Sequence, residues 1–205
     1  MTAAKPYTRI ARLYDLLDLP FEYGRYRRLR QIVWTGLQGR ILDAGVGTGR
    51  NMIYYPTASR MTAIDLSPAM LARARSRQGR LRCPVELYEM DVRQTTLPRA
   101  HFDAIISTFL FCVLSDADQL PALMELRRIV KPDGEVRILE YAYSKRPLKR
   151  LVMRLWAPWV RWLYGATFDR NTEQYVEQAG FDLVEERFLY QDIIKLLVLK
   201  PKQSG

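Results

Sequence analysis

Short apolar runs alternate with amphipathic segments along most of the chain, and this alternation predicts a sheet covered by helices. The apolar runs, separated by turn residues, are expected to be strands at residues 40–44, 61–65, 85–90, 102–108 and 135–140. Ser67-Pro68 has the form of a helix start, with a capping hydroxyl and a proline in the first turn. Further helices are expected up to about Tyr55 and from Ser115 or Asp116 to Ile129, with a turn at 131–134.

Both ends of the chain depart from this alternation. Residues 7–34 have a helical period that Pro20 and Gly24 interrupt, which predicts two short helices. Near the C-terminus a helix is expected at 171–179, followed by apolar runs at 181–189 and 193–199. Because only a short turn separates these two runs, they must pair antiparallel, as a hairpin at the sheet edge. The predicted fold is of the α/β class: a Rossmann-like, doubly wound, mostly parallel sheet of about seven strands with a C-terminal antiparallel hairpin.

A glycine-rich turn follows the first predicted strand. Gly45, Gly47 and Gly49 are spaced by single residues, and the polar Asn51 comes soon after. A chain that leaves a buried strand must reverse sharply, and glycine tolerates the positive φ that this requires. Glycine also lets backbone N–H groups approach a ligand closely. With a second strand that ends in an acid, the layout predicts a nucleotide-type site at the carboxyl edge of a parallel sheet.

Three acids stand at or just beyond the ends of successive predicted strands. Asp65 is placed to accept both hydroxyls of a ribose, since a carboxylate has two acceptor oxygens, and Asp91 to accept from an adenine amine. Asp43 lies under the glycine turn, where it favours a ligand with a cationic part and disfavours a dinucleotide. For one acid alone, capping a turn is the simpler explanation. Three acids at successive strand ends, in register with a glycine loop, favour a binding site.

With this glycine turn and these three acids, the chain resembles a known family, the class I S-adenosylmethionine-dependent methyltransferases. The matching segments are Leu42–Gly49, Ile64–Met70, Glu89–Val92, Phe102–Phe109 and Leu126–Glu135. They cover most of residues 38–140, and the closing helix and hairpin fit the same fold. One departure is Val46, where the family more often has cysteine or serine, and no consequence is expected from it.

The resemblance implies how the cofactor, S-adenosylmethionine, and its product, S-adenosylhomocysteine, would be held. The backbone of 45–49 would wrap the methionine part and Asp43 would lie near its amino group. Asp65 would hold the ribose, and Asp91 with the Val92 amide would contact adenine. The other residues expected at the cofactor are Tyr14, Asn51, Leu66, Met70, Ser107, Thr108 and Phe109. For Tyr14, which would close over the cofactor, ordinary helix packing is an equal alternative.

The resemblance divides the single domain, residues 1–205, into functional parts. These are an N-terminal helical lid at 1–37, a cofactor-binding core at 38–140, an amphipathic insert at 141–170, and the closing helix and hairpin at 171–205. The length of 205 residues is typical of one domain.

The charge balance indicates an anionic partner. Lys and Arg number 32 against 22 Asp and Glu, a formal net charge of +10, which fits nucleic acid, anionic lipid or an acidic substrate. No segment resembles a signal peptide, and no uninterrupted apolar stretch reaches the ~18 residues of a membrane span. Cys83 and Cys112 lack metal-ligand spacing, so we expect reduced thiols in a cytoplasmic protein without a metal site.

Residues 145–164 combine tryptophans, other apolar side chains and basic residues on one predicted helix, which Pro158 would kink. The apolar residues that gather on one side are Leu148, Leu151, Val152, Leu155, Trp156, Trp159, Trp162 and Leu163. The basic residues are Lys145, Arg146, Lys149, Arg150, Arg154 and Arg161. This composition is typical of a helix in a membrane interface. A helix packed on its own domain and an RNA-binding surface stay open, although no added RNA-recognition module is visible.

A membrane-surface methyltransferase of this size resembles the bacterial phospholipid N-methyltransferases, which convert phosphatidylethanolamine stepwise to phosphatidylcholine. The chain is also similar to quinone-ring C-methyltransferases through Leu139-Glu140-Tyr141-Ala142, although the insert after Tyr143 departs from their pattern. A third related type methylates small apolar thiols. The phospholipid is preferred because a basic surface suits a phosphate headgroup. A catalytically silent module that binds the cofactor or RNA is a further alternative, which the three intact acids disfavour.

For a phospholipid acceptor, the protein mainly positions the reactants and excludes water. Residues that would orient the amine and help release its proton are Tyr14, Tyr23, Tyr26 and Tyr141. Arg25 and Arg28 would hold the phosphate, whereas His101, in a turn before a strand, is not expected to be a base. The expected partners are an anionic membrane surface and a phospholipid headgroup, without metal or nucleic acid. The protein is expected to be a monomer attached peripherally to the inner membrane.

Overall fold

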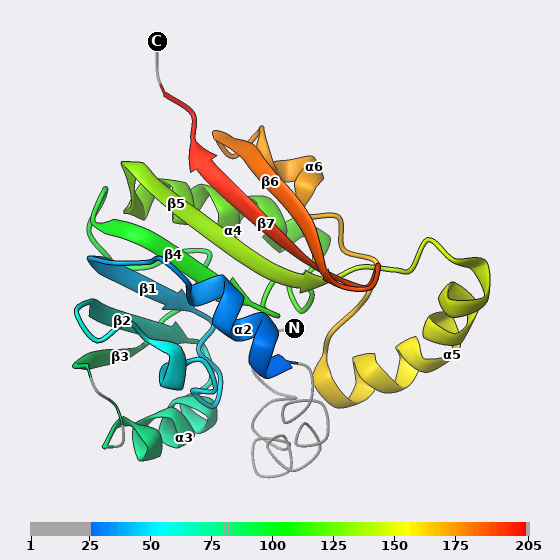
Figure 1. Ribbon diagram of the computed structural model, residues 1–205, viewed down its shortest axis with the longest axis horizontal. Coiled ribbons are helices and arrows are strands. Elements are labelled where there is room, and N and C mark those ends of the chain that lie inside the picture. The colour runs from blue at the N-terminus through cyan, green and yellow to red at the C-terminus, as the bar shows by residue number, and fades with distance from the viewer. Residues whose placement is uncertain (1–25, 80, 82, 204–205) are drawn as a thin grey trace.

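The computed structural model describes residues 26–79, 81 and 83–203 (Figure 1). The strands are β1 (Arg40–Ala44), β2 (Arg60–Asp65), β3 (Val85–Glu89), β4 (Phe102–Thr108), β5 (Val130–Tyr141), β6 (Phe181–Tyr190) and β7 (Ile194–Pro201). The helical elements are α2 (Arg27–Trp34), the 3₁₀ turn η2 (Met52–Tyr54), α3 (Pro68–Gln78), α4 (Asp116–Ile129), α5 (Pro147–Tyr164) and α6 (Glu173–Val176).

All of the strands form one sheet in the order β3-β2-β1-β4-β5-β7-β6. The pairs among β1 to β5 are parallel, whereas β7 is antiparallel to both β5 and β6. The strand order reverses beside β1, so the carboxyl ends of β1 and β4 flank the point where ligands bind in such sheets. This architecture confirms the predicted Rossmann-like sheet and its closing hairpin.

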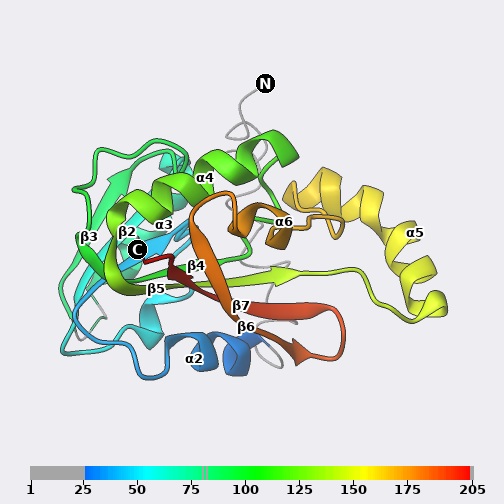
Figure 2. The same cartoon turned by 90° about the horizontal axis from the view of Figure 1, so that it is seen from above.

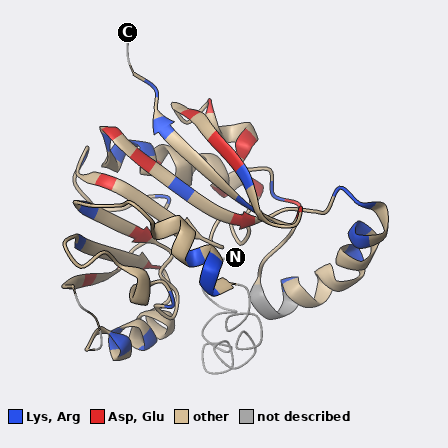
Figure 3. Ribbon diagram, in the orientation of Figure 1, with Lys and Arg blue, Asp and Glu red and all other residues tan. Residues whose placement is uncertain are grey.

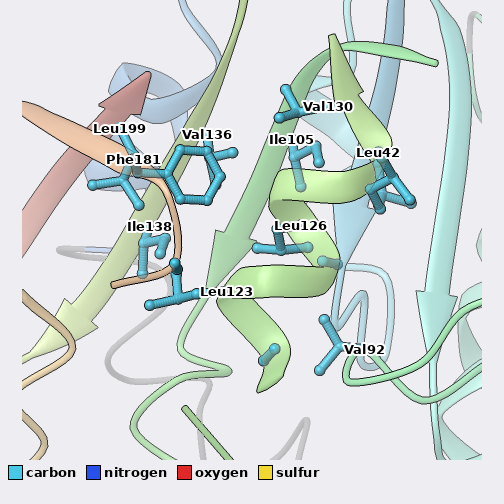
Figure 4. Close-up of a cluster of buried hydrophobic side chains, with 14 of the residues drawn as sticks. Leu42, Val92, Ile105, Leu123, Leu126, Val130, Val136, Ile138, Phe181 and Leu199 are labelled. Carbon is cyan, nitrogen blue, oxygen red and sulfur yellow. The ribbon is translucent and has the colours of Figure 1, made fainter. Parts of the chain in front are cut away.

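The two faces of the sheet bury separate apolar clusters, because successive side chains of a strand point to opposite faces. Leu42 and Ile105 pack with α4 and α6 on one face (Figure 4). Ile41 and Ile106 pack with α2 and α3 on the other. Seen from above, α4 and α2 lie on opposite sides of the sheet (Figure 2). Both faces are therefore covered, as the continuous apolar runs predict.

The predicted turn at residues 131–134 is an irregular part of β5. Phe102 pairs with Val130 and Ala104 with Glu135, so the intervening residues of β5 bulge from the ladder. A Cβ on Gly134 would lie 2.8 Å from the backbone oxygen of Asp103, so only glycine fits there. Lys131 forms an ion pair with Asp103 across the same bulge.

Two predicted helices are shorter than expected. Instead of a helix up to Tyr55, only the 3₁₀ turn η2 forms, because the glycine turn continues to Gly49, where φ is +82°. Too few residues remain before Pro56 to nucleate an α-helix. The helix predicted at 171–179 is limited to α6. The segment ends at Gly180, whose N–H donates a hydrogen bond to the oxygen of Glu177 at 3.0 Å.

The α5 helix extends away from the sheet, joined to it by the segments on either side (Figure 1). Among its residues up to Arg161, no side chain is buried. The alternative in which this helix packs its apolar side on the domain is therefore wrong. No helix within the described ranges is both long enough and apolar enough to cross a bilayer.

The core accounts for a testable difference between two neighbouring residues of α4. Leu126 is fully buried, whereas Met124 is 54% exposed. We expect Leu126→Ala to lower the free energy of unfolding by about 2–5 kcal/mol, because it leaves a cavity between α4 and the sheet. Met124→Ala is the matched control, with a change within about 0.5 kcal/mol. Urea denaturation measures both, and equal losses would contradict the packing described.

Candidate active site

The glycine turn lies at the carboxyl end of β1, and its three glycines have different surroundings. The N–H groups of Gly45 and Val46 each donate to the oxygen of Ile64, at 2.9 Å, which joins the turn to β2. A Cβ on Gly45 would lie 3.1 Å from the Leu110 side chain, and one on Gly49 3.1 Å from the Cα of Ala74. A Cβ on Gly47 would meet nothing within 4 Å. Gly45 and Gly49 thus leave little room for a Cβ, and Gly47 borders open space.

Asp65, at the end of β2, is hydrogen-bonded to the same turn. Its Oδ2 accepts from the N–H of Gly47 and its Oδ1 from the N–H of Ser67, both at 2.8 Å. Burial raises the pKa of this carboxyl, while the backbone N–H donors oppose that shift. The carboxylate keeps partial exposure beside the open side of Gly47. The structure therefore brings together two of the predicted cofactor-binding features.

Asp43 lies at the centre of a buried polar network. Its two oxygens each accept from Nδ2 of Asn51 at 3.1 Å, and Oδ2 also accepts from the hydroxyl of Tyr55 at 2.7 Å. The side chain has no exposed surface. Desolvation by this burial raises the pKa of Asp43 to about 6, against the opposing effect of its hydrogen bonds. Asp43 thus fixes the residues that follow the glycine turn.

Arg30 extends this network to α2 and β4. One of its terminal nitrogens donates to Oδ1 of Asn51 at 2.6 Å and to the hydroxyl of Thr108 at 3.2 Å. Nδ2 of Asn51 also donates to that hydroxyl, at 2.9 Å. Although it is charged, Arg30 is only 7% exposed. Its spacing from Val33 and Trp34 puts it on the buried face of α2, a signal that the sequence contained.

Asp91 is paired within the protein. The guanidinium of Arg93 bonds both of its oxygens and also reaches Asp118 on α4, at 2.5 Å. The Arg93 guanidinium holds the pKa of Asp91 below its usual value. The predicted adenine contact of Asp91 and of the buried Val92 stays a prediction. Arg93 is a residue that sequence reasoning did not identify at this site.

Aromatic side chains gather at the carboxyl ends of β4 and β5. The hydroxyls of Tyr26 and Tyr141 lie 2.6 Å apart, and the Phe109 ring stacks on Tyr141 with centroids 4.7 Å apart. Phe109 has φ of +57°, a backbone conformation that bulky residues rarely adopt. Such strain is commonly found at functional sites. The predicted pair Tyr26 and Tyr141 is thus brought together beside Phe109.

The remaining predicted residues fall into three groups. Tyr14, Tyr23 and Arg25 lie outside the described residues. Met70, Ser107 and Thr108 are buried, and Leu66 is partly buried near Asp65. Within the described part of the chain, the Ser107 hydroxyl has no hydrogen-bond partner. Arg28 is exposed on α2, and His101 lies at the opposite end of β4, where its ring packs edge-on against Phe102.

Known proteins are similar in sequence to the region that contains this site. Residues 41–134 match a family described as "Methyltransferase domain". The chain is 37% identical over 113 residues to a phosphatidylethanolamine N-methyltransferase from Cereibacter sphaeroides, covering 54% of this chain and 55% of that protein. It is 28% identical over 162 residues to a demethylmenaquinone methyltransferase from Tropheryma whipplei, covering 75% of this chain and 66% of that one. The chain therefore spans about half to two thirds of the length of these relatives.

A solved structure supports the fold. The TehB-like S-adenosylmethionine-dependent methyltransferase from Corynebacterium glutamicum superposes with a TM-score of 0.62, covering 84% of this chain and 86% of that one. At 20% sequence identity, this likeness concerns the fold.

The buried carboxyl of Asp43 generates a prediction about pH. Because its pKa is raised to about 6, the folded protein holds a proton there more tightly than the unfolded chain does. The resulting stabilisation is present below about pH 4 and is lost as the pH rises through about 6. Relative to Asp43→Asn, the wild-type free energy of unfolding should fall by on the order of 2–3 kcal/mol over that range.

Urea denaturation at several pH values measures this difference. The matched control is Asp182→Asn, the same substitution at an exposed position of β6. Parallel profiles for wild type and Asp43→Asn would show that this carboxyl has no raised pKa.

The geometry suits S-adenosylmethionine. The open side of Gly47 and the carboxylate of Asp65 lie together, as a ribose and an amino-acid chain require, and the buried Asp43 adds negative charge for a cationic ligand. The family match covers this same region, from β1 to the bulge of β5. Residues 41–134 therefore form a methyltransferase domain whose cofactor is S-adenosylmethionine, and the chain has the fold of S-adenosylmethionine-dependent methyltransferases.

Proposed function

We propose that the chain transfers methyl groups from S-adenosylmethionine to the amine of phosphatidylethanolamine and its methylated forms at a membrane surface, leading to phosphatidylcholine. The observation that carries this proposal is the exposed apolar side of α5. Leu148 is 75% exposed, Leu155 70%, Trp156 63% and Trp159 66%. Monomeric soluble proteins rarely leave so large an apolar surface uncovered.

The surroundings of that apolar side favour a lipid surface. Tryptophan is typical of the boundary between headgroups and acyl chains, and arginine and lysine can extend their charged ends toward phosphates. Lys and Arg residues occur on α5 and at the start of α2 (Figure 3). Each basic residue near an anionic bilayer contributes ~1 kcal/mol. We infer that the protein attaches reversibly and peripherally through α5.

Different residues of the candidate active site would have different roles in the reaction. When bound, the cofactor supplies an electrophilic methyl group. The glycine turn and Asp65 would hold it, and Phe109 with its tyrosine neighbours would exclude water from the acceptor. The acceptor amine must be neutral to react. The paired hydroxyls of Tyr26 and Tyr141 can accept a hydrogen bond from its N–H group and so orient its lone pair. Arg25 stays a prediction as a phosphate contact.

A second acceptor has specific support. The demethylmenaquinone methyltransferase matches 75% of this chain, more than the 54% that the phosphatidylethanolamine methyltransferase matches. C-methylation of a quinone precursor is therefore the alternative, since such a precursor also lies in membranes. The phospholipid is preferred because the exposed arginines of α5 suit a phosphate.

Labelled-methyl transfer to a total lipid extract decides between these acceptors. Incubated with labelled S-adenosylmethionine, the protein should produce methylated ethanolamine lipids, which chromatography separates from quinones. Asp65→Ala is the control, and it should lower transfer at least about tenfold, because a lost charge-assisted hydrogen bond costs about 1.5–3 kcal/mol. Label in a quinone fraction alone would refute the phospholipid proposal.

Membrane attachment has a separate test by vesicle flotation. The double variant Trp156→Ala/Trp159→Ala should bind anionic vesicles about tenfold more weakly or worse, since burying one large apolar side chain contributes about 1.5–3 kcal/mol. The matched control is Leu183→Ala/Val184→Ala, which removes exposed apolar side chains from β6. Equal flotation of both variants would exclude α5 as the membrane-binding element.

A further inference from the structure

A cleft of about 600 Å³ lies between α5 and the segment that follows it. Its lining residues are Tyr143, Arg154, Ala157, Pro158, Arg161, Thr167, Phe168 and Asp169. It is separate from the glycine turn, and no residue predicted from the sequence as a cofactor or acceptor contact lines it. The α5 residues in the lining are spaced by three, four and seven positions, so they share one face of the helix.

This face is distinct from the apolar side of α5. At 100° per residue, Arg154 and Arg161 point well away from the stripe formed by Leu155 and Trp159. A membrane bound to the apolar side would therefore leave the cleft open toward the body of the protein. The cleft would lie at the level where headgroups meet water.

The charges of the cleft suit a phosphate with one negative charge. Two turns of helix separate Arg154 from Arg161, a distance of about 10 Å along the axis. Both arginines and Asp169 are exposed, and within the described residues none of the three forms an ion pair with another side chain. Each guanidinium can bind one of the two charged oxygens of a phosphodiester, and Asp169 opposes the further negative charge that a phosphomonoester carries.

Aromatic contacts connect the cleft with the candidate active site. Phe168, in the cleft, lies 5.8 Å from Tyr143 and 5.5 Å from Tyr141, measured between ring centroids. Tyr141 in turn stacks on Phe109, beside Tyr26. A headgroup whose phosphate lies between the arginines can thus extend its amine along these rings, whose faces attract cations.

We propose that this cleft binds the phosphodiester of the acceptor, with Arg154 and Arg161 holding the phosphate and Phe168 and Tyr141 guiding the amine toward Phe109. This inference rests on the proposed function, which it deepens by assigning a headgroup site. Guanidiniums bind phosphate oxygens by paired hydrogen bonds, so replacing them by an uncharged amide removes both charge and geometry. A quinone ring, which carries no phosphate, would gain nothing from these arginines.

The test is a calorimetric titration of the full chain with dihexanoyl-phosphatidylethanolamine below its micellar concentration. Arg154→Gln/Arg161→Gln should raise the Kd at least about tenfold, as expected for lost charge-assisted bonds. The control is Arg146→Gln/Lys149→Gln, which removes equal charge from the start of α5, outside the cleft, and should change the Kd less than about twofold. O-phosphoethanolamine, a monoester, forms a second arm and should bind the wild type more weakly. Circular dichroism checks that all variants fold.

Each outcome separates the inference from the proposed function. Equal weakening in both double variants, or no binding of dihexanoyl-phosphatidylethanolamine by the wild type, overturns the cleft as a site. If phosphatidylethanolamine is methylated with the same KM by wild type and Arg154→Gln/Arg161→Gln, the proposed function stands and the cleft inference falls. If the wild type binds this lipid through the arginines but transfers no methyl group to it, the cleft stands as a phosphodiester site, whereas its role as an acceptor site and the proposed function fall. Tighter binding of the monoester would refute the phosphodiester and favour a soluble phosphate ligand.

Discussion

The buried carboxylate of Asp43 is the interaction on which the rest of the site depends. It holds Asn51 and Tyr55 in place, and Asn51 connects to Arg30 on α2 and to Thr108 on β4. The glycine turn is thereby held at a fixed distance from two other elements. A buried charge is costly unless its hydrogen bonds are made, so the network is either complete or strongly destabilising. The site and the fold are therefore stabilised by the same contacts.

Much of this site follows from local sequence, and the rest depends on contacts between distant residues. Strand ends and glycine spacing placed Gly47 and Asp65 together correctly, because parallel strands share one carboxyl edge. The pairing of Asp91 with Arg93 was missed, because a two-residue spacing after a strand does not show which way a side chain turns. The burial of Arg30 was not predicted either, because a charged side chain is usually exposed, and here distant residues hydrogen-bond its guanidinium.

The amphipathic insert at residues 141–170 also shows that local sequence does not determine how a helix lies relative to the rest of the protein. Its amphipathic pattern predicted a helix correctly, and composition suggested a lipid-facing side. Whether that side packs on the domain or faces outward depends on the length and direction of the connections around α5, which no periodicity encodes. The structure leaves the side exposed and forms a cleft lined by Arg154 and Arg161 on another face. One helix thus presents two chemically different surfaces.

The left-handed backbone at Phe109 has a consequence for affinity. Its N–H donates to the oxygen of Leu139 at 2.7 Å, and its ring rests against Tyr141, so both backbone and ring are fixed. Because Phe109 and Tyr141 are already ordered, binding of the acceptor costs little conformational entropy of the protein. That entropy is lost once, during folding, and is not lost again in each catalytic turnover.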